Sequence, residues 1–595
     1  MSGATKSPGT GAFAIEKVVV FGAVILGAGF SAIHATGWVL AAVTGNPPPA
    51  FSIPHVLAAI RLRPYVPGVA PGFHVALLAC LVVAAAWGAG RALRWRSSRA
   101  AAPSHRATGF DTRPGWATPE AVRRVASTRA LMAQATALRP RLAKPRPVDV
   151  GYLLGASRGQ EVWASVERSI LVVGPPGSGK GLHLAINAIL DAPGSVITTS
   201  TKPDNIKATL LARAARGPVG VFDPQGMLGA HFEYQVAWDP IDGCEDPIRA
   251  ATRAEALAAN TGITSNGENA VWRGHAKTII ECVLHAAALN GADIDTAYRW
   301  MQSPHAMDLP LVILENHSQA CPTWDSRLRG LIQNPDPRFV GSVMSVVASA
   351  ITPLSLPTVR AALTPTATRP GITAGDLLRD SGTLYALATD RGAGASAGLV
   401  SALIEDIAYV ARVTAARSPG GRMDPPVLFL LDECANVAPI PSLPNLLADG
   451  RGQSLTIIPI FQTLAQVRSR YGDEDASTVF SASQIKLILG GSDDADDCRD
   501  ISGLIGERDD WYATTSGSAH ALAIDTGATT SSSLRKVPIL PPDAIRSIPF
   551  GSAVMLLSQA DPFPLRLRPW THRRDAKHVA RQQADIENQI LQGDG

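Results

Sequence analysis

The chain has 595 residues, 46% of them hydrophobic, and a formal net charge of only +4. This length allows several domains with a large buried core, and the near-neutral charge by itself indicates no partner. The six cysteines are scattered without a CxxC pair and the histidines are not clustered, so the sequence fits a reducing compartment and indicates neither a zinc site nor a disulfide framework.

Two long uncharged segments predict a membrane anchor over residues 1–96. They cover about 18–43 and 68–90, and each is longer than the roughly 20 residues that cross a bilayer. A cleaved signal peptide or a buried hairpin of a soluble domain is a weaker interpretation, because the first segment is too long for a signal peptide and a second span follows it. Arginines directly after the second span place the rest of the chain in the cytoplasm, with both termini inside.

Residues 97–149 are expected to form a basic juxtamembrane linker. Thirteen Lys or Arg and only two acids lie between residues 91 and 146, and attraction to anionic lipid explains them better than DNA binding does. Thr118-Pro119-Glu120 supplies an N-cap, a first-position proline and a first-turn acid, which predicts a helix that continues to about Leu138.

A glycine-rich loop predicts a nucleotide site. It lies between the apolar segments 169–173 and 182–190, which is the strand, loop and helix order of a phosphate-binding loop, and an ordinary turn is the weaker alternative. The glycines let several backbone N–H groups converge on one anion, and Lys180 adds a full positive charge. Gly181 stands where Ser or Thr usually offers a hydroxyl to Mg²⁺, so that ligand must come from elsewhere. The candidate nucleotide-binding residues are Gly174, Pro175, Pro176, Gly177, Ser178, Gly179, Lys180 and Gly181.

The order of apolar segments predicts an α/β nucleotide domain that is interrupted by helices. Strand-like segments occur before residue 239 and return after 372, and the segment between them has only helical patterns, at about 248–257, 271–289, 295–301 and 340–350. The Thr-, Ser-, Gly- and Ala-rich segment 512–533 is expected to be a mobile loop. The expected domains are a split P-loop ATPase domain at 150–239 and 372–572, an all-α domain at 240–371, and a polar tail at 573–595.

The segment 427–433 is an apolar strand that ends in two adjacent acids, the Walker B form. Asp432 is predicted to hold Mg²⁺, directly or through water, and Glu433 to polarise the attacking water. Phosphoryl transfer depends mostly on positioning and charge neutralisation, so these carboxylates and Lys180 supply much of what ATP hydrolysis needs. Many strands end in acids, and the P-loop in the same chain makes this pattern specific.

Three motifs carry a resemblance to a known family. With GPPGSGKG at 174–181, FLLDECAN at 429–436 and GRGQSLTIIPIFQTLAQVRSRYG at 450–472, the chain resembles TraG/TraD-type coupling proteins of conjugation and type IV secretion, including a TraM-recognition-like C-terminal part. The resemblance covers most of residues 18 to about 570. It implies an α/β fold, a RecA-like P-loop NTPase domain with an all-α insertion domain and two N-terminal transmembrane helices. Several similar members also carry Gly after the loop lysine.

Two more site residues follow from this resemblance. Arg451 stands at the place of an arginine that reaches the nucleotide of the neighbouring subunit, and Gln462 at the place of a glutamine that senses the γ-phosphate. A guanidinium acting in trans would neutralise transition-state charge and couple hydrolysis to assembly. A solvated loop arginine and an ordinary polar residue at a strand end are the alternatives.

The expected function is a membrane-anchored ATPase, with ATP and Mg²⁺ as cofactors, that couples a DNA–relaxase substrate to a type IV secretion channel and powers DNA transfer. A homo-hexamer in the bacterial cytoplasmic (inner) membrane, multi-pass and with its bulk in the cytoplasm, is expected to move single-stranded DNA. The alternatives are a non-hydrolysing receptor, against which Asp432, Glu433 and Gln462 argue, and a septal-type double-stranded DNA translocase. The candidate DNA contacts are Lys202, Arg360 and Arg369, whereas Trp272 is better explained as a core residue.

Overall fold

The computed structural model describes residues 31, 33–48, 50, 79, 109–229, 231–261, 263, 269–388, 396–516 and 529–592. The chain divides into two compact units, Met1–Ala107 and Thr108–Gly595. In the first unit, residues 33–44 are helical. None of the helices in the described part of the chain is both long and apolar enough for a membrane crossing. Most of the two expected spans, 18–43 and 68–90, lies outside the described residues.

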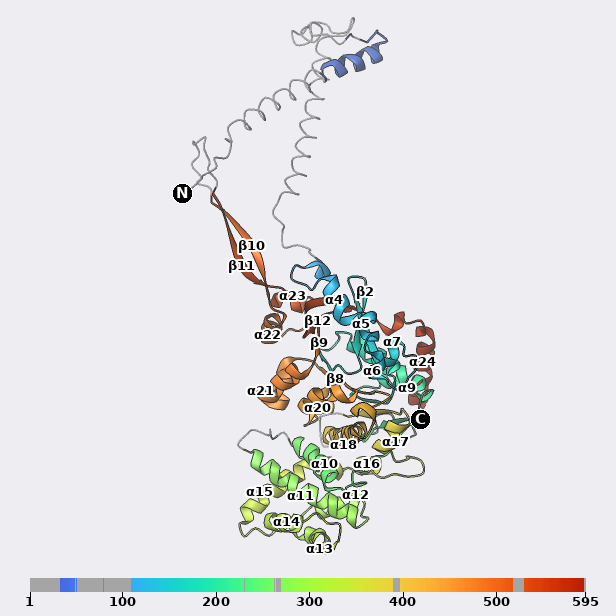
Figure 1. Ribbon diagram of the computed structural model, residues 1–595, viewed down its shortest axis with the longest axis vertical. Helices are drawn as coiled ribbons and strands as arrows, with labels where there is room; N and C mark the ends of the chain where they lie inside the picture. The colour runs from blue at the N-terminus through green and yellow to red at the C-terminus, as the bar shows by residue number, and fades with distance from the viewer. Residues whose placement is uncertain are drawn as a thin grey trace. The chain divides into compact units, whose positions relative to one another are not determined.

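The second unit is built on a mixed sheet of 11 strands (Figure 1). Its strands lie in the order β2-β1-β13-β12-β9-β3-β8-β7-β4-β6-β5. The strands from β9 to β5 are parallel, and those from β2 to β12 extend the sheet in antiparallel pairing. The strands are β1 Gly151–Ser157, β2 Gln160–Ser165, β3 Ile170–Val173, β4 Val196–Ser200, β5 Val219–Phe222, β6 Thr383–Leu387, β7 Val427–Leu431, β8 Leu455–Phe461, β9 Ile485–Leu489, β12 Ser552–Leu557 and β13 Ala560–Leu567.

Hydrophobic side chains cover both faces of this sheet. In β3, Leu171 and Val173 belong to one core cluster, and Ile170 and Val172 belong to the other. Alternate residues of a strand point to opposite faces, so a strand buried on both sides is apolar throughout. The helices outside the insertion are α4 Pro119–Ala126, α5 Thr128–Met132, α6 Ala135–Leu138, α7 Pro147–Val150, α8 Ile186–Asp191, α9 Asp204–Ala214, α17 Ala374–Arg379, α18 Ala397–Ala416, α19 Cys434–Val437, α20 Leu443–Asp449, α21 Leu464–Ala482, α22 Ala495–Ile505, α23 Pro542–Arg546 and α24 Ala576–Gln592.

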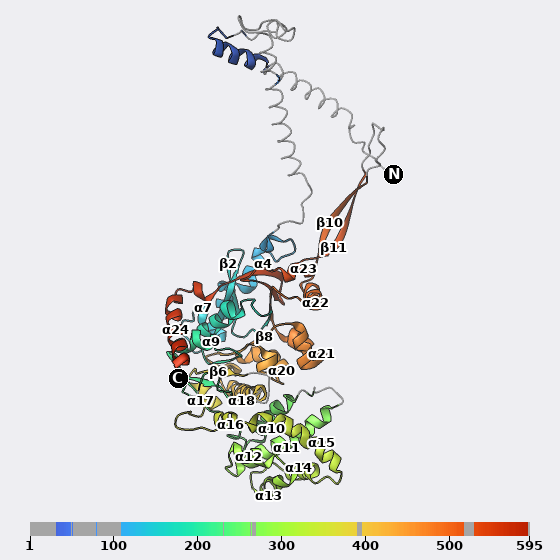
Figure 2. The same cartoon turned by 180° about the vertical axis from the view of Figure 1, so that it is seen from behind.

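Between β5 and β6 the chain forms a separate group of helices, and the described residues from 247 to 362 include no strand. An isolated bridge pairs Ala237 with Gly371, where the chain leaves the sheet domain and returns to it. Figures 1 and 2 show these helices together at one end of the second unit. They are α10 Pro247–Ala259, α11 Ala270–Leu289, α12 Ile294–Trp300, α13 Asp308–Asn316, α14 Trp324–Ile332, α15 Pro337–Ala350 and α16 Pro357–Ala362.

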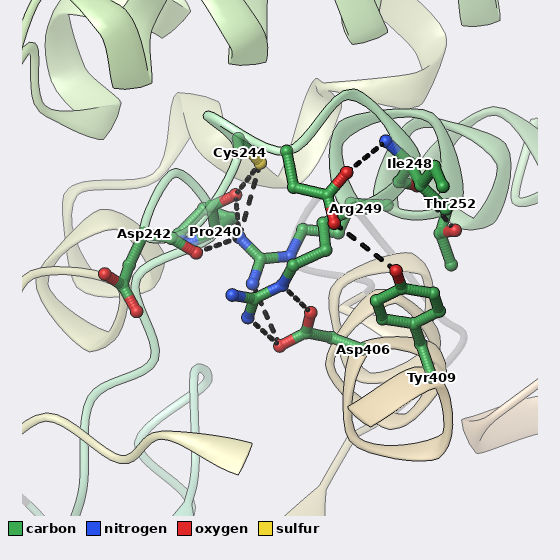
Figure 3. A network of polar contacts seen from close by, with 10 residues as sticks. Pro240, Asp242, Cys244, Ile248, Arg249, Thr252, Asp406 and Tyr409 are labelled. Carbon is green, nitrogen blue, oxygen red and sulfur yellow. Dashed lines mark hydrogen bonds and ion pairs between the residues drawn. The ribbon is translucent and has the colours of Figure 1, made fainter. Parts of the chain in front are cut away.

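A buried ionic network joins this helical group to the sheet domain (Figure 3). Arg249 and Arg253 of α10 both pair with Asp406 of α18, each at 2.9 Å. Arg253 is 1% exposed and also donates to the carbonyls of Pro240 and Asp242, each at 2.7 Å. A buried charge is tolerated only when it is paired and hydrogen-bonded, and this aspartate meets that condition for two guanidinium groups.

Two expectations about local structure were wrong. The segment 512–533 is not a loop throughout, because β10 (Glu507–Ser516) pairs with β11 (Thr529–Pro538) from Glu507↔Pro538 to Ser516↔Thr529. Its β-branched threonines favour a strand as strongly as its Ser and Gly suggest a loop. The helix expected up to Leu138 is broken after α4, because the Ser127 hydroxyl donates to the Arg123 carbonyl and accepts from the Ala130 N–H, which starts α5.

The polar C-terminal segment forms α24, which packs on α9 (Figure 2). Val579 and Ile586 on its inner face are buried, and Lys207 of α9 pairs with Glu587 at 2.8 Å.

Candidate nucleotide-binding site

The glycine-rich loop begins where β3 ends and leads into a π-helical turn, Gly181–Ala185, that continues as α8. Gly177 and Gly179 have φ values of +78° and +84°, in the left-handed region that only glycine adopts readily. A Cβ atom on Gly179 would also lie 2.6 Å from His183 Nδ1. Both backbone conformation and space therefore require glycine at position 179.

Lys180 is held against its own loop. Its Nζ donates to the carbonyls of Gly174 at 2.6 Å and Pro175 at 3.4 Å. Burial lowers the pKa of the Lys180 ammonium from its usual value, and the nearby carboxylates of Asp432 and Glu433 oppose that shift. The charges of Lys180, Asp432 and Glu433 therefore interact with one another within one site.

The loop forms one wall of a pocket of about 300 Å³. Its other walls come from the segments after β4, β7 and β8, since the carboxyl ends of parallel strands meet at one edge of a sheet. Lys180, Asp432, Glu433 and Gln462 all line this pocket. A larger cavity of about 700 Å³ lies among α10, α11, α20 and α21, and the glycine-rich loop does not contribute to its lining.

Asp432 and Glu433 follow directly after β7. Burial raises the pKa of the Asp432 carboxyl to about 6, against the attraction of Lys180 and with a contribution from the charge of Glu433. Asp432 Oδ1 accepts a hydrogen bond from the Glu433 N–H at 3.1 Å, and the Asp432 carbonyl accepts one from Thr199 Oγ1 at 2.9 Å. Glu433 itself has φ +50°, an unfavourable conformation for a residue with a Cβ that is tolerated mainly at functional sites.

Gln462 follows β8, which lies between the P-loop strand β3 and the Walker B strand β7. Its backbone N–H donates to Gln466 Oε1 at 3.0 Å, while Thr463 caps the start of α21 through the Gln466 N–H. Gln462 lines the pocket together with the phosphate loop and the two acids.

Arg451 lies outside this group. It belongs to a 3₁₀ turn, Gly450–Gln453, that precedes β8, and it is exposed. Gln462 follows the other end of the same strand, and seven strand residues span roughly 20 Å at about 3.3 Å per residue. The structure thus brings four of the five candidate catalytic residues to one pocket and places Arg451 at the opposite edge of the sheet.

The sequence analysis missed part of the site. Asp204 and Asn205, at the start of α9, line the pocket together with Ser200 and Thr201. The signal was the polar run that directly follows the buried strand β4. Lys202, a candidate DNA contact, lines this same pocket.

The other residues considered for DNA contact are engaged within the all-α group and at its base. Arg360 pairs with Asp295, Arg369 donates to Gln235 Oε1, and the Trp272 ring packs against Phe339 at a centroid distance of 5.6 Å. Among the described residues, no group of three or more His, Cys, Asp or Glu side chains is arranged to hold a metal ion. A metal held by Asp432 would take its other ligands from phosphate oxygens and water, in keeping with the hard-oxygen preference of Mg²⁺.

Comparison with known proteins supports the family resemblance. Residues 426–550 match the family described as the TraM recognition site of TraD and TraG. Protein VirD4 of Rhizobium radiobacter is 24% identical over 426 residues, which are 69% of this chain and 58% of that protein, so the match spans less than two thirds of the relative.

A solved structure of a bacterial conjugative coupling protein shares the fold. TrwBdeltaN70 in its trigonal form with sulphate is 15% identical and matches with a TM-score of 0.50 over 68% of this chain and 86% of its own. Its unbound monoclinic form, also 15% identical, gives 0.48 over 74% and 91%. The mixed α/β fold and the resemblance to TraG/TraD-type coupling proteins, both expected from the sequence, are confirmed.

Proposed function

We propose that this chain, which resembles TraG/TraD-type coupling proteins, is a membrane-anchored ATPase that couples a DNA–relaxase substrate to a type IV secretion channel and powers DNA transfer. The observation that carries the proposal is the convergence of Lys180, Asp432, Glu433 and Gln462 on one pocket beside a glycine-rich loop. Two carboxylates, a lysine and a loop of backbone N–H groups are the parts that phosphoryl transfer from ATP requires.

Each residue has a distinct task in this proposal. The loop and Lys180 bind the phosphates, Gln462 contacts the terminal phosphate, and Glu433 orients the attacking water and accepts its proton. Asp432 holds Mg²⁺ directly or through water, which makes up for the missing hydroxyl at Gly181. When bound, Mg²⁺ neutralises charge that develops on the phosphate oxygens. The raised pKa of the Asp432 carboxyl is consistent with a site built to receive a cation.

The partners and the location belong to the same proposal. The match of residues 426–550 to a TraM recognition site supports a role in recruiting the DNA-processing complex. The uncharged segments at about 18–43 and 68–90 support an anchor in the cytoplasmic membrane. Arg451 lies at the opposite edge of the sheet from the pocket of its own subunit. This position favours a ring in which the arginine reaches the nucleotide of the neighbouring subunit, and the family resemblance implies that the ring is a homo-hexamer.

An ATPase assay of the full chain in detergent tests the proposal, with single-stranded, double-stranded or no DNA. We expect Mg²⁺-dependent hydrolysis that single-stranded DNA stimulates and that Lys180→Ala abolishes. Nucleotide binding without hydrolysis under all three conditions would instead identify a non-hydrolysing receptor. Stimulation by double-stranded DNA alone would favour a translocase of the septal type.

A further inference from the structure

We propose that the side-chain amide of Asn205 donates a hydrogen bond to the terminal phosphate of a bound nucleoside triphosphate. The inference rests on the proposed ATPase function and adds a phosphate-sensing residue from a part of the chain that no motif identified. This residue would distinguish a triphosphate from a diphosphate at the wall of the pocket that faces the P-loop.

The Asn205 amide is a buried donor without a partner. The residue is 3% exposed, and its Nδ2 atom has no hydrogen-bond acceptor among the described residues. Asn205 nevertheless lines the pocket of about 300 Å³ that the P-loop and the two acids form. Buried polar groups in native proteins are almost always satisfied, so an orphaned amide at the edge of a ligand pocket indicates an acceptor that the ligand supplies.

The backbone around Asn205 is held firmly. Its carbonyl accepts from Thr209 Oγ1 at 2.6 Å, and that hydroxyl lies 2.7 Å from the Tyr385 hydroxyl in β6. The next residue, Ile206, is buried in a cluster that includes Ile586 of α24. The amide therefore sits on a fixed support rather than on a loose turn, which is the arrangement that a positioned donor requires.

The position of α9 points to the terminal phosphate. The strand order is β3-β8-β7-β4, so the start of α9, at the carboxyl end of β4, lies on the Walker B side of the pocket. In the proposed site, the terminal phosphate extends from the P-loop toward Asp432 and Glu433, the carboxylates assigned to the metal and the attacking water.

The first turn of α9 carries charges of both signs. Among the described residues no side chain caps this 11-residue helix, so its first N–H groups add partial positive charge beside the amide, and the carboxylate of Asp204 in the same turn opposes it. The Asn205 amide is thus the donor that the turn offers to a phosphate. Nδ2 can only donate, and phosphate oxygens can only accept, so the pair is complementary.

Equilibrium binding of two fluorescent nucleotides to the full chain in detergent tests this proposal. The probes are a non-hydrolysable ATP analogue and ADP, both with Mg²⁺. We expect Asn205→Ala to weaken binding of the ATP analogue about 10-fold, as for loss of a hydrogen bond to a charged group, and to leave ADP binding unchanged. Asn205→Asp keeps the size but replaces the donor by a negative charge, and it should weaken the ATP analogue further.

Asn187→Ala is the matched control, because the Asn187 amide is also buried but donates within the protein, to the carbonyls of His183 and Arg568, and does not line the pocket. We expect it to lower the melting temperature and to leave the ratio of the two affinities unchanged. Equal losses for both nucleotides in Asn205→Ala, or wild-type binding of the ATP analogue, would overturn the inference and leave the ATPase proposal intact. Failure of the unaltered chain to bind either nucleotide would overturn both.

Discussion

Glu433 combines a strained backbone with a position at the rim of the nucleotide pocket. A left-handed conformation at a non-glycine residue costs roughly 1 kcal/mol or more and persists where the surrounding structure enforces it. Here the preceding buried strand β7 and the following turn of α19 enforce it. The side chain of Glu433 is consequently attached to a fixed backbone position beside Asp432.

Lys180 and Glu433 should separate binding from turnover. Under the proposed function, Lys180 contacts the phosphates before reaction, so we expect Lys180→Ala to weaken ATP binding about 10-fold or more. Glu433→Gln should bind ATP normally and lose about 10²-fold or more in turnover, because it removes only the carboxylate that the proposal assigns to the attacking water. Isothermal titration and steady-state hydrolysis measure the two effects. Hydrolysis by Glu433→Gln at the wild-type rate would show that another group activates the water.

Asp432 should make the stability of the nucleotide- and metal-free protein depend on pH. Its pKa is raised to about 6 in the folded state, so the folded protein binds this proton more tightly than the unfolded chain does. The stabilising contribution is complete below about pH 4 and is lost as the pH rises through about 6. Asp432→Asn should therefore be the more stable protein at pH 8, by about 3 kcal/mol at most, with the difference disappearing near pH 4. Urea unfolding at a series of pH values measures this, and a constant difference across the series would contradict it.

At the scale of elements, local motifs predicted more of the site than of the fold around it. The P-loop and the Walker B strand are each one continuous stretch of sequence, so the order of residues within each stretch was sufficient to predict Lys180 and Asp432 as site residues. Asn205 was not identifiable, because its place depends on β4 lying beside β7, more than 200 residues away in the chain. The hairpin β10–β11 was missed since composition alone does not distinguish a Thr-rich strand from a loop.

The attachment of α10 to α18 is expected to depend on Asp406. Asp406→Ala would leave two guanidinium groups without their carboxylate, one of them 1% exposed, and should destabilise the protein by about 3–5 kcal/mol. Asp500→Ala, which breaks the exposed pair with Arg468, is the control and should change the melting temperature little. The double variant Arg253→Leu, Asp406→Leu should be less destabilised than Asp406→Ala. Equal melting temperatures for Asp406→Ala and Asp500→Ala would show that the network does not anchor the helices.

At the scale of the whole molecule, the position of Arg451 makes a shared active site testable. We expect Arg451→Ala and Lys180→Ala subunits each to be inactive alone, and Arg451→Ala to lose about 10³-fold or more in turnover. When the two kinds of subunit are mixed, ATPase activity should partly recover. Recovery is expected because some interfaces then combine an intact loop with an intact arginine. No recovery despite proven co-assembly would contradict a finger acting between subunits, and full activity of Arg451→Ala would remove it from the mechanism.

The expected membrane topology also concerns the whole chain. Two spans with arginines directly after the second predict that the C-terminus is cytoplasmic and that Pro48 faces the other side. A reporter that is active only in the cytoplasm, fused at each position, measures this. A signal from the Pro48 fusion, or none from the C-terminal fusion, would rule the topology out.

The strand order has a further consequence, for the timing of synthesis. The P-loop strand β3 is paired on both sides by strands made much later, since Val172 lies opposite Ile460 and Ile170 opposite Ile485. β1 in turn pairs with β13, one of the last strands of the chain. A nascent chain that has already exposed its glycine-rich loop outside the ribosome therefore has no sheet on which to hold it. The candidate nucleotide pocket can therefore form only after nearly all of the chain has been translated.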